Sequence, residues 1–385
     1  MNFPGSIQSK LPAVVTTIFT VMSALAREHD AINLSQGFPD FSPHPLLQKE
    51  MDKAIQSGYN QYAPMAGLLP LREQLAAKVE RLYGAVVHPE SEITITAGGT
   101  QALFTAILAM VRENDEVILF APAYDSYAPA VELAGGKPLY YNMEVPDFNI
   151  QWQQVKKLIT QRTRMIVINS PHNPSGTVLT EKDMKELEKI TKGTDIIILS
   201  DEVYEHILFD EAKHQSVLRY PRLAERSMVV SSFGKTYHAT GWKVGYCIAP
   251  PTLTAEFRKA HQYNVFSVHT PTQYAYTEIL KLPNIYEELP AFYQAKRDFF
   301  RDAVKGSKFD LLDCKGTYFQ LASYKRVSDE KDTDFVKWLT KEMKVAAIPI
   351  SVFYHQHLDQ KVIRFCFAKE QETLEKAAEK LHRVR

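Results

Sequence analysis

The chain has 385 residues, of which 45% are hydrophobic and 23% charged, as in an ordinary globular protein of one large or two smaller domains. Its 45 lysines and arginines balance 45 aspartates and glutamates, which argues against nucleic acid or a membrane surface as a partner. The three cysteines have no metal or redox spacing, and we predict no metal site. No apolar run has membrane-spanning length and no signal peptide is evident, so we expect a cytoplasmic protein.

The first 40 residues contain many turn-forming residues, and we expect an irregular N-terminal arm there. From residue 93 onward, strand-like apolar runs alternate with helical patterns. These apolar runs lie at residues 93–96, 117–121, 165–169, 196–200, 228–232 and 244–248. One helix between them begins at Thr180, where Asp183 completes a capping box. The alternation predicts a large α/β domain over residues 41–275, with a mainly parallel sheet and helices on both faces.

The last third of the chain has a different pattern. Residues 271–305 are mostly helical, with breaks expected at Pro283 and Pro290. Strand-like runs follow at residues 317–322 and 362–367, and a helix from about residue 332 lies between them. We therefore expect a smaller α+β domain over residues 276–385, to which the N-terminal arm contributes.

Lys235 is a candidate nucleophile, because it follows the apolar run at 228–232. Desolvation at a buried strand end lowers the pKa of a lysine and frees its amine to form a Schiff base. Taken alone, such a lysine is more often an ordinary surface residue. The residues at the other strand ends favour a reactive role for Lys235, because the carboxyl ends of parallel strands meet at one edge of the sheet.

The neighbouring strand ends carry groups that suit the parts of one small molecule. A phosphate suits the helix start at Gly99, Thr100 and Gln101, an aromatic ring suits Tyr124, and a ring oxygen suits Asn173 and Tyr204. Asp201 directly follows an apolar run, where a buried carboxylate needs a partner such as a protonated ring nitrogen. Together with Lys235, these groups describe a site for pyridoxal phosphate, a phosphorylated aromatic aldehyde.

The chain resembles the class I and II aminotransferases of fold type I over nearly its whole length. The matching segments are residues 33–41 (NLSQGFPDF), 60–67 (NQYAPMAG), 172–177 (HNPSGT), 200–204 (SDEVY) and 231–235 (SSFGK), together with Arg364. Within the family, the runs FPDF, GKTY and TGWKVG suggest the methionine, glutamine/phenylpyruvate and kynurenine aminotransferase branch. The resemblance implies the fold type I architecture, with a large sheet domain that binds the cofactor and a smaller C-terminal domain.

The resemblance also implies a role for each site residue. The catalytic residues would be Lys235, which carries the cofactor and moves the substrate's α-proton, Asp201, which keeps the pyridine nitrogen protonated, and Tyr204. The cofactor would also be bound by Gly99, Thr100, Gln101, Tyr124, Asn173, Ser232 and Lys243, and by Tyr62 of a neighbouring subunit. Arg364 would hold the substrate carboxylate with help from Gly37 and Asn173. The position of Tyr62 implies a homodimer with shared active sites.

Two details bear on binding. Lys243 stands where many relatives carry arginine. A lysine keeps the positive charge for a phosphate but cannot donate the two parallel hydrogen bonds of a guanidinium. Candidates for the substrate side-chain pocket are uncharged or aromatic: Phe19, Phe38, Tyr62, Val268, His269 and Phe353. With no second arginine evident for a side-chain carboxylate, we predict an uncharged L-amino acid (methionine, aromatic, leucine or glutamine) as the donor.

The predicted reaction is a ping-pong transfer of the amino group to a 2-oxo acid. A pyridoxal-phosphate-dependent cysteine-conjugate β-lyase stays open as an alternative, because the same residues would serve it. A non-catalytic regulator is disfavoured, since the chain has no evident DNA-binding segment. A nicotinamide dehydrogenase is disfavoured too, because Gly98–Gly99 lacks the spaced three-glycine fingerprint.

Overall fold

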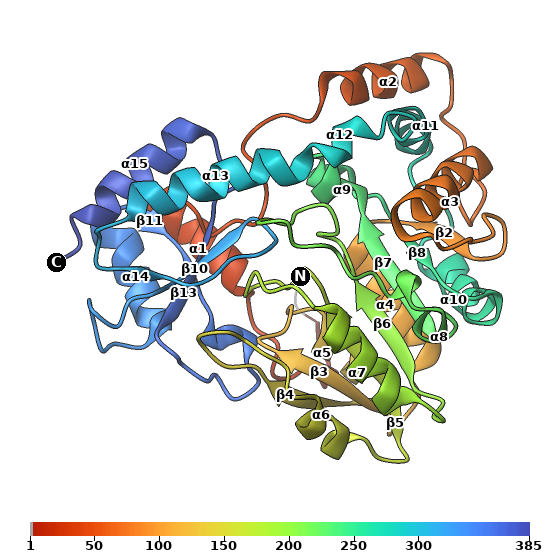
Figure 1. The fold of residues 1–385 in the computed structure, drawn as a ribbon, viewed down its shortest axis with the longest axis horizontal. Coiled ribbons are helices and arrows are strands. Elements are labelled where there is room, and N and C mark those ends of the chain that lie inside the picture. Colours follow the sequence, from red (N-terminus) through yellow and green to blue (C-terminus); the bar gives the residue numbers. More distant parts are fainter. Residues whose placement is uncertain (1–2) are drawn as a thin grey trace.

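A seven-stranded sheet forms the larger part of the molecule in the computed structural model, which describes residues 3–385 (Figure 1). Its strand order is β2-β8-β7-β6-β5-β3-β4. The strands are β2 (Ile93–Thr96), β3 (Glu116–Ala121), β4 (Lys137–Asn142), β5 (Thr163–Asn169), β6 (Ile197–Asp201), β7 (Ser227–Ser232) and β8 (Gly245–Ile248). All neighbours run parallel except β8, which is antiparallel to β2 and β7. The predicted mainly parallel sheet is confirmed, and the sequence pattern missed only the half-exposed edge strand β4.

Helices cover both faces of this sheet, which is why its inner strands read as continuous apolar runs. In β3, Ile118 and Phe120 pack into one core, whereas Val117 and Leu119 pack into the other. The first core includes residues of α2 (Pro45–Gln56), α3 (Leu69–Tyr83), α6 (Trp152–Leu158), α7 (Glu181–Thr191), α8 (Pro221–Ala224) and α11 (Thr270–Ile279). The second includes residues of α4 (Gly99–Met110), α5 (Tyr127–Leu133) and α10 (Pro251–Asn264). The capping box predicted at Thr180 and Asp183 is confirmed.

A second, antiparallel sheet of order β12-β13-β10-β9 forms the C-terminal unit together with three helices. Its strands are β9 (Asp310–Leu311), β10 (Phe319–Ser323), β12 (Ile348–Pro349) and β13 (Val362–Cys366). Its helices are α13 (Leu289–Val304), α14 (Asp332–Glu342) and α15 (Gln371–His382), preceded by the short α12 (Asn284–Glu287). Figure 1 shows α13 running from the side of the large sheet to this unit. The helical stretch breaks at Glu288, between α12 and α13, as expected near Pro290. Pro290 itself lies in the first turn of α13, where its missing N–H has no helical partner to lose.

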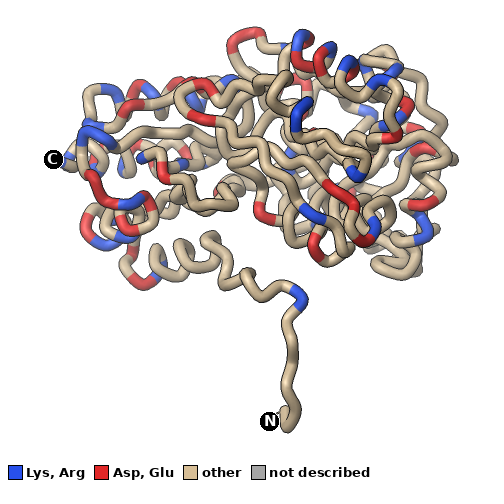
Figure 2. The backbone as a smooth tube through the Cα atoms, turned by 90° about the horizontal axis from the view of Figure 1, so that it is seen from below, with Lys and Arg blue, Asp and Glu red and all other residues tan. Residues whose placement is uncertain are grey.

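The expected irregular arm is wrong for residues 18–28, which form α1 (Ile18–Glu28). The Thr17 side chain accepts from the N–H of Thr20 and starts the helix, and Met22 and Ala26, one turn apart, are buried. The turn-forming residues around this stretch hid its apolar period. Residues preceding α1 project away from the body of the molecule (Figure 2).

The segment after α1 returns to the C-terminal unit. There β1 (Ile32–Asn33) pairs in parallel with β11 (Val345–Ala346). This pairing supports the assignment of the arm to the smaller domain, and the boundaries at residues 40 and 275 stay a prediction. Within residues 3–385, no helix combines the length and the apolar character that crossing a bilayer requires.

Candidate active site

A cavity of about 250 Å³ lies where β5, β6 and β7 end, beside the C-terminal unit. Eleven of the residues predicted to act in catalysis or to bind the cofactor or the substrate carboxylate line it: Gly37, Gly99, Thr100, Tyr124, Asn173, Asp201, Tyr204, Ser232, Lys235, Lys243 and Arg364. Most come from the carboxyl edge of the large sheet, whereas β13 supplies Arg364 and the segment after β1 supplies Gly37. The fold therefore gathers at one place residues that lie more than three hundred positions apart.

Two predicted cofactor residues lie outside this cavity. The Gln101 side chain accepts from the N–H of Ala97 at 2.9 Å and donates to the Thr105 hydroxyl at 2.6 Å. Its amide is therefore engaged elsewhere, and only its backbone N–H is left for the expected phosphate role. The Tyr62 side chain is 80% exposed and meets the Phe266 ring edge-on. A role toward a neighbouring subunit stays a prediction for this tyrosine.

Lys235 lies in α9 (Phe233–Thr236), directly after β7. Its amine donates to the Gly37 carbonyl at 3.2 Å and to the Tyr318 hydroxyl at 2.9 Å. Burial lowers the pKa of Lys235 to about 8, and the positive charge of Arg364 acts in the same direction. A substantial fraction of the amine is therefore unprotonated at neutral to mildly alkaline pH, as a nucleophile requires. Tyr318 was missed because nothing in the local sequence distinguishes it from a core tyrosine.

Asp201 ends β6 and is buried. The Tyr127 hydroxyl donates to its Oδ2 at 2.6 Å, and the Val203 N–H donates to its Oδ1 at 3.3 Å. Burial nevertheless raises the pKa of Asp201 to about 6. A carboxylate held in this way gains from a cation beside it, as a protonated ring nitrogen would be.

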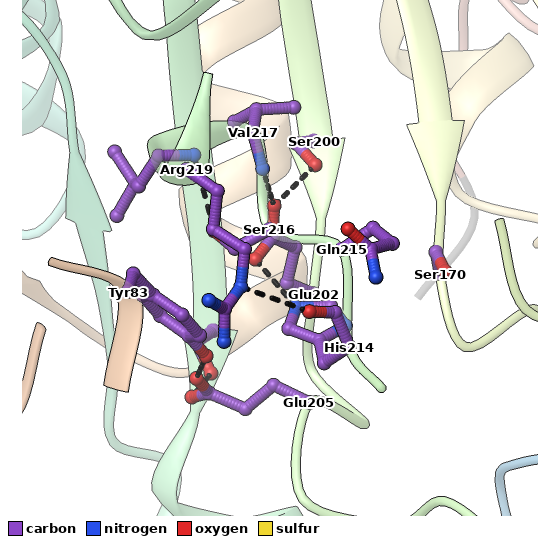
Figure 3. A network of polar contacts seen from close by, with 12 residues as sticks. Tyr83, Ser170, Ser200, Glu202, Glu205, His214, Gln215, Ser216, Val217 and Arg219 are labelled. Carbon is purple, nitrogen blue, oxygen red and sulfur yellow. Dashed lines mark hydrogen bonds and ion pairs between the residues drawn. The ribbon is translucent and has the colours of Figure 1, made fainter. Parts of the chain in front are cut away.

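The residues after Asp201 divide between the cavity and the interior: Val203 and Tyr204 line the cavity. Glu202 and Glu205 join a buried polar network (Figure 3). Glu202 accepts from Ser200 at 2.7 Å, from His214 at 2.7 Å and from the Val217 N–H at 3.1 Å. Glu205 accepts from Lys78 at 2.7 Å, from Ser231 and Tyr246 at 2.8 Å, and from Tyr83. These bonds anchor the turn that presents Asp201 and Tyr204.

The start of α4 forms a cradle of the kind that binds phosphate. Gly98 has a φ of +85°, and a Cβ built there would lie 3.3 Å from the Lys243 amine, so only glycine leaves this space open. The first N–H groups of α4 have no partner within the helix. The hydroxyls of Thr100 and Tyr124 lie 3.2 Å apart at the same mouth. Helix N–H groups beside a lysine fit a dianion, so these residues fit the phosphate of the expected cofactor.

Arg364 is almost fully buried, with 1% of its surface exposed. Its Nη1 donates to Asn173 Oδ1 at 2.7 Å, its Nη2 donates to the Ser35 carbonyl at 3.3 Å, and its guanidinium lies 3.8 Å from the centroid of the Phe319 ring. Among residues 3–385, nothing accepts a hydrogen bond from its buried Nε. An unpartnered buried donor is costly, and a bound carboxylate would satisfy it.

Only some of the candidates for the side-chain pocket lie at the cavity, and their role toward a substrate stays a prediction. Phe19 and Phe38 line the cavity, and Phe353 packs against Phe19 with ring centroids 5.9 Å apart. The other three candidates lie elsewhere in this chain: Val268 is in the core, His269 bonds to Thr272, and Tyr62 is on the surface. Apolar residues are mostly core residues, and the sequence pattern does not separate the two uses.

The arrangement defines the class of protein. The molecule has a mainly parallel sheet beside a smaller α+β unit, with a half-buried lysine, a buried carboxylate and an anion cradle at the edge between them. This is the plan of fold type I transferases that use pyridoxal phosphate. The family described as aminotransferase class I and II matches residues 29–381. The chain belongs to this family, whose members depend on pyridoxal phosphate, and it is an aminotransferase.

Individual relatives agree with this assignment. A methionine aminotransferase from Escherichia coli is 52% identical over 384 residues, which cover 100% of both chains. A solved Escherichia coli structure identified as having methionine aminotransferase function has a TM-score of 0.97 at 52% identity and covers 99% of this chain and 100% of its own. Human kynurenine–oxoglutarate transaminase 1 is 33% identical, with 93% of each chain covered. These relatives confirm the branch suggested by the sequence motifs.

Proposed function

We propose that this aminotransferase takes its amino group from an uncharged L-amino acid, with methionine as the principal donor, and passes it to a 2-oxo acid. The ring of aromatic side chains around Arg364 carries this proposal. The guanidinium lies 5.5 Å from the Phe19 ring and 5.8 Å from the Phe353 ring, in addition to its close contact with Phe319. A substrate whose carboxylate binds Arg364 thus meets apolar surface, which suits a thioether or an aromatic side chain. The methionine and kynurenine enzymes among its relatives support this choice.

The residues of the cavity fit pyridoxal phosphate part by part. When bound, this cofactor supplies an aldehyde that condenses with amines and a ring that takes up the electron pair released at the substrate's α-carbon. We propose that Lys235 binds the aldehyde and Asp201 the ring nitrogen, while Tyr124 covers the ring. Asn173 and Tyr204 would bind the ring oxygen. The phosphate would be held by Ser232, Lys243, Thr100 and the backbone N–H groups of Gly99 and Gln101.

Each side chain then has one task during turnover. Arg364 binds the α-carboxylate through its fork, including the Nε that now lacks a partner, and so fixes the orientation of the α-carbon. Lys235, once released by the substrate's amine, removes the α-proton and later returns it. Asp201 stays ionised while a cation faces it and so stabilises the protonated ring. The second substrate, a 2-oxo acid, uses the same residues in reverse order.

We further propose a homodimer in which each subunit contributes to the other's site. The exposed aromatic pair of Tyr62 and Phe266, with 80% and 50% of their surfaces accessible, supports this proposal. Exposed aromatic side chains of this size are typical of interfaces. The segment before α1 projects from the body of the molecule (Figure 2). Within it, the apolar residues Phe3 and Ile7 are 68% and 80% exposed.

The proposed function is tested by adding methionine to the holoenzyme in the absence of an oxo acid. We expect the cofactor absorbance to change to that of the pyridoxamine form, with one equivalent of the methionine-derived oxo acid released per site. Glutamate, with its second carboxylate, should react at least about tenfold more slowly. The lyase alternative predicts pyruvate and ammonia from a cysteine conjugate without the pyridoxamine form, and that result would overturn the proposal.

Replacing Arg364 by lysine should weaken substrate recognition without removing the positive charge. The lysine amine cannot form the bidentate fork, so we expect kcat/KM for methionine to fall by about 100-fold. Steady-state kinetics measures this, and the resting cofactor absorbance should be unchanged. The matched control is Arg326→Lys, since Arg326 lies away from the cavity, where it pairs with Asp310 and donates to the Ser307 carbonyl. An unchanged kcat/KM would show that the substrate carboxylate binds elsewhere.

A further inference from the structure

The two acceptors of the Lys235 amine come from two other parts of the chain. Gly37, whose carbonyl is 3.2 Å from the amine, lies between β1 and α2. Tyr318, whose hydroxyl is 2.9 Å away, directly precedes β10 of the C-terminal unit. The amine is thus a point at which the large sheet, the N-terminal segment and the C-terminal unit meet.

Tyr318 closes a triangle of hydrogen bonds around this amine. Its hydroxyl donates its only proton to the Gly37 carbonyl at 2.7 Å. Burial, and next the neighbouring Tyr204, raise the pKa of Tyr318 well above its ordinary value, so the hydroxyl keeps that proton. Its oxygen can then act toward Lys235 only as an acceptor.

The Tyr318 ring is also held in place. It is fully buried and meets the Tyr204 ring edge-on, with centroids 5.2 Å apart. The Phe319 ring at 4.9 Å and the Tyr293 ring at 5.7 Å also pack against it. A hydroxyl on a ring packed in this way has little freedom to move. Its position relative to the lysine is therefore set by the fold.

These contacts fix the direction of the amine's lone pair. A neutral lysine amine has two N–H bonds and one lone pair in a tetrahedral arrangement. If Gly37 and Tyr318 accept the two N–H bonds, the lone pair takes the remaining direction. Gly37 and Lys235 both line the cavity, whereas Tyr318 lies behind them. Because Lys235 and Arg364 line the same cavity, the lone pair would be available to a substrate α-carbon held there by Arg364.

We propose that Tyr318 is a positioning residue that, with the Gly37 carbonyl, orients the free amine of Lys235 for proton transfer. This inference rests on the proposed function, since it takes Lys235 as the group that moves the α-proton. The lone pair of Lys235 would take the α-proton, the amine would become an ammonium, and that ammonium would later give the proton back. The bound cofactor would take up the electron pair of the C–H bond, so no outside reagent is needed.

The test is Tyr318→Phe, which keeps the ring and removes only the acceptor. In single-turnover reactions of the holoenzyme with methionine, we expect the first-order rate constant to fall by about 10- to 100-fold. The isotope effect with α-deuterated methionine should rise, because proton transfer then limits the reaction. The dissociation constant for methionine and the resting absorbance should stay within about twofold of wild type. The variant changes neither the Arg364 guanidinium, which binds the substrate carboxylate, nor the bond between Lys235 and the cofactor.

The matched control is Tyr293→Phe. Tyr293 is equally buried and packs on Tyr318, but within residues 3–385 its hydroxyl has no partner. Removing that hydroxyl should leave the rate constant and the isotope effect unchanged. If both variants lose rate alike, Tyr318 acts through packing, and the inference is wrong.

A second measurement does not depend on activity. In a crystal structure of the pyridoxamine form, in which Lys235 is free, its amine should lie within hydrogen-bond distance of Tyr318 Oη and the Gly37 carbonyl. It should leave this position in Tyr318→Phe. An amine that lies elsewhere in the wild type would overturn the inference even if the variant folds poorly. The proposed function itself fails separately, if Lys235→Ala retains turnover.

Discussion

Lys235→Ala is expected to reduce transamination by about 10⁴-fold or more, because the variant loses both the covalent anchor and the group that moves the α-proton. The cofactor absorbance of the protein-bound Schiff base should disappear. Its fold should persist, since the amine contributes only two hydrogen bonds at the edge of a cavity. Methionine half-reactions, absorbance spectra and thermal unfolding together measure this outcome.

The control for this variant is Lys259→Ala, which removes an exposed lysine whose partner is Glu256 on the same helix. It should leave turnover and absorbance unchanged. Addition of methylamine should restore part of the lost rate in Lys235→Ala, because a free amine can then enter the vacated space. Turnover near that of wild type without added amine would remove Lys235 from the mechanism.

Asp201→Ala is expected to slow removal of the α-proton by about 10³-fold and to weaken retention of the cofactor, because the ring loses the carboxylate that keeps its nitrogen protonated. Rapid-mixing kinetics with methionine measures the first effect, and dialysis followed by cofactor titration measures the second. Asp195→Ala is the control, since Asp195 lies just before the opposite end of β6 and is exposed. Unchanged single-turnover kinetics in Asp201→Ala would contradict the assigned role.

The pKa of Asp201 adds a stability signature to this prediction. Burial raises that pKa to about 6, above the ordinary value of the unfolded chain, so the contribution of Asp201 to folding stability is largest at acid pH and declines as pH rises through 6. A cation on the cofactor ring would offset this loss. We therefore expect the cofactor to raise the melting temperature of wild type more at pH 8 than at pH 5. In Asp201→Asn this difference should be smaller, because the asparagine does not ionise.

Much of the site follows from one rule of topology. The parallel strands were recognisable from their apolar runs, and parallel strands end at one edge. Lys235 and Asp201, together with Asn173 and Tyr124, follow different strands, and all line a single cavity. The same rule does not say which way a side chain points. The sequence predicts that Gln101 binds the phosphate, but its side chain bonds to Ala97 and Thr105, so only its backbone N–H is left for that role.

Contacts between distant segments were decided only by the tertiary structure. Tyr127 reaches Asp201 across 74 positions, and Tyr318 reaches Lys235 across 83. Neither tyrosine stands out locally, because a packed tyrosine and a hydrogen-bonding one have the same sequence surroundings. Likewise, α1 was hidden by the turn-forming residues around it, although its apolar period is regular.

The sequence by itself therefore determined the class of fold, and it predicted Lys235 and Asp201 as candidate site residues. These inferences depend on strand order and on short motifs, which local patterns record, whereas the role predicted for Arg364 came from the family resemblance. The tertiary structure decided that Arg364 keeps one donor free for a ligand, that aromatic rings surround it and that Tyr318 holds the lysine amine. Those features depend on packing between the C-terminal unit, the N-terminal segment and the large sheet, and no local pattern encodes a contact across such distances.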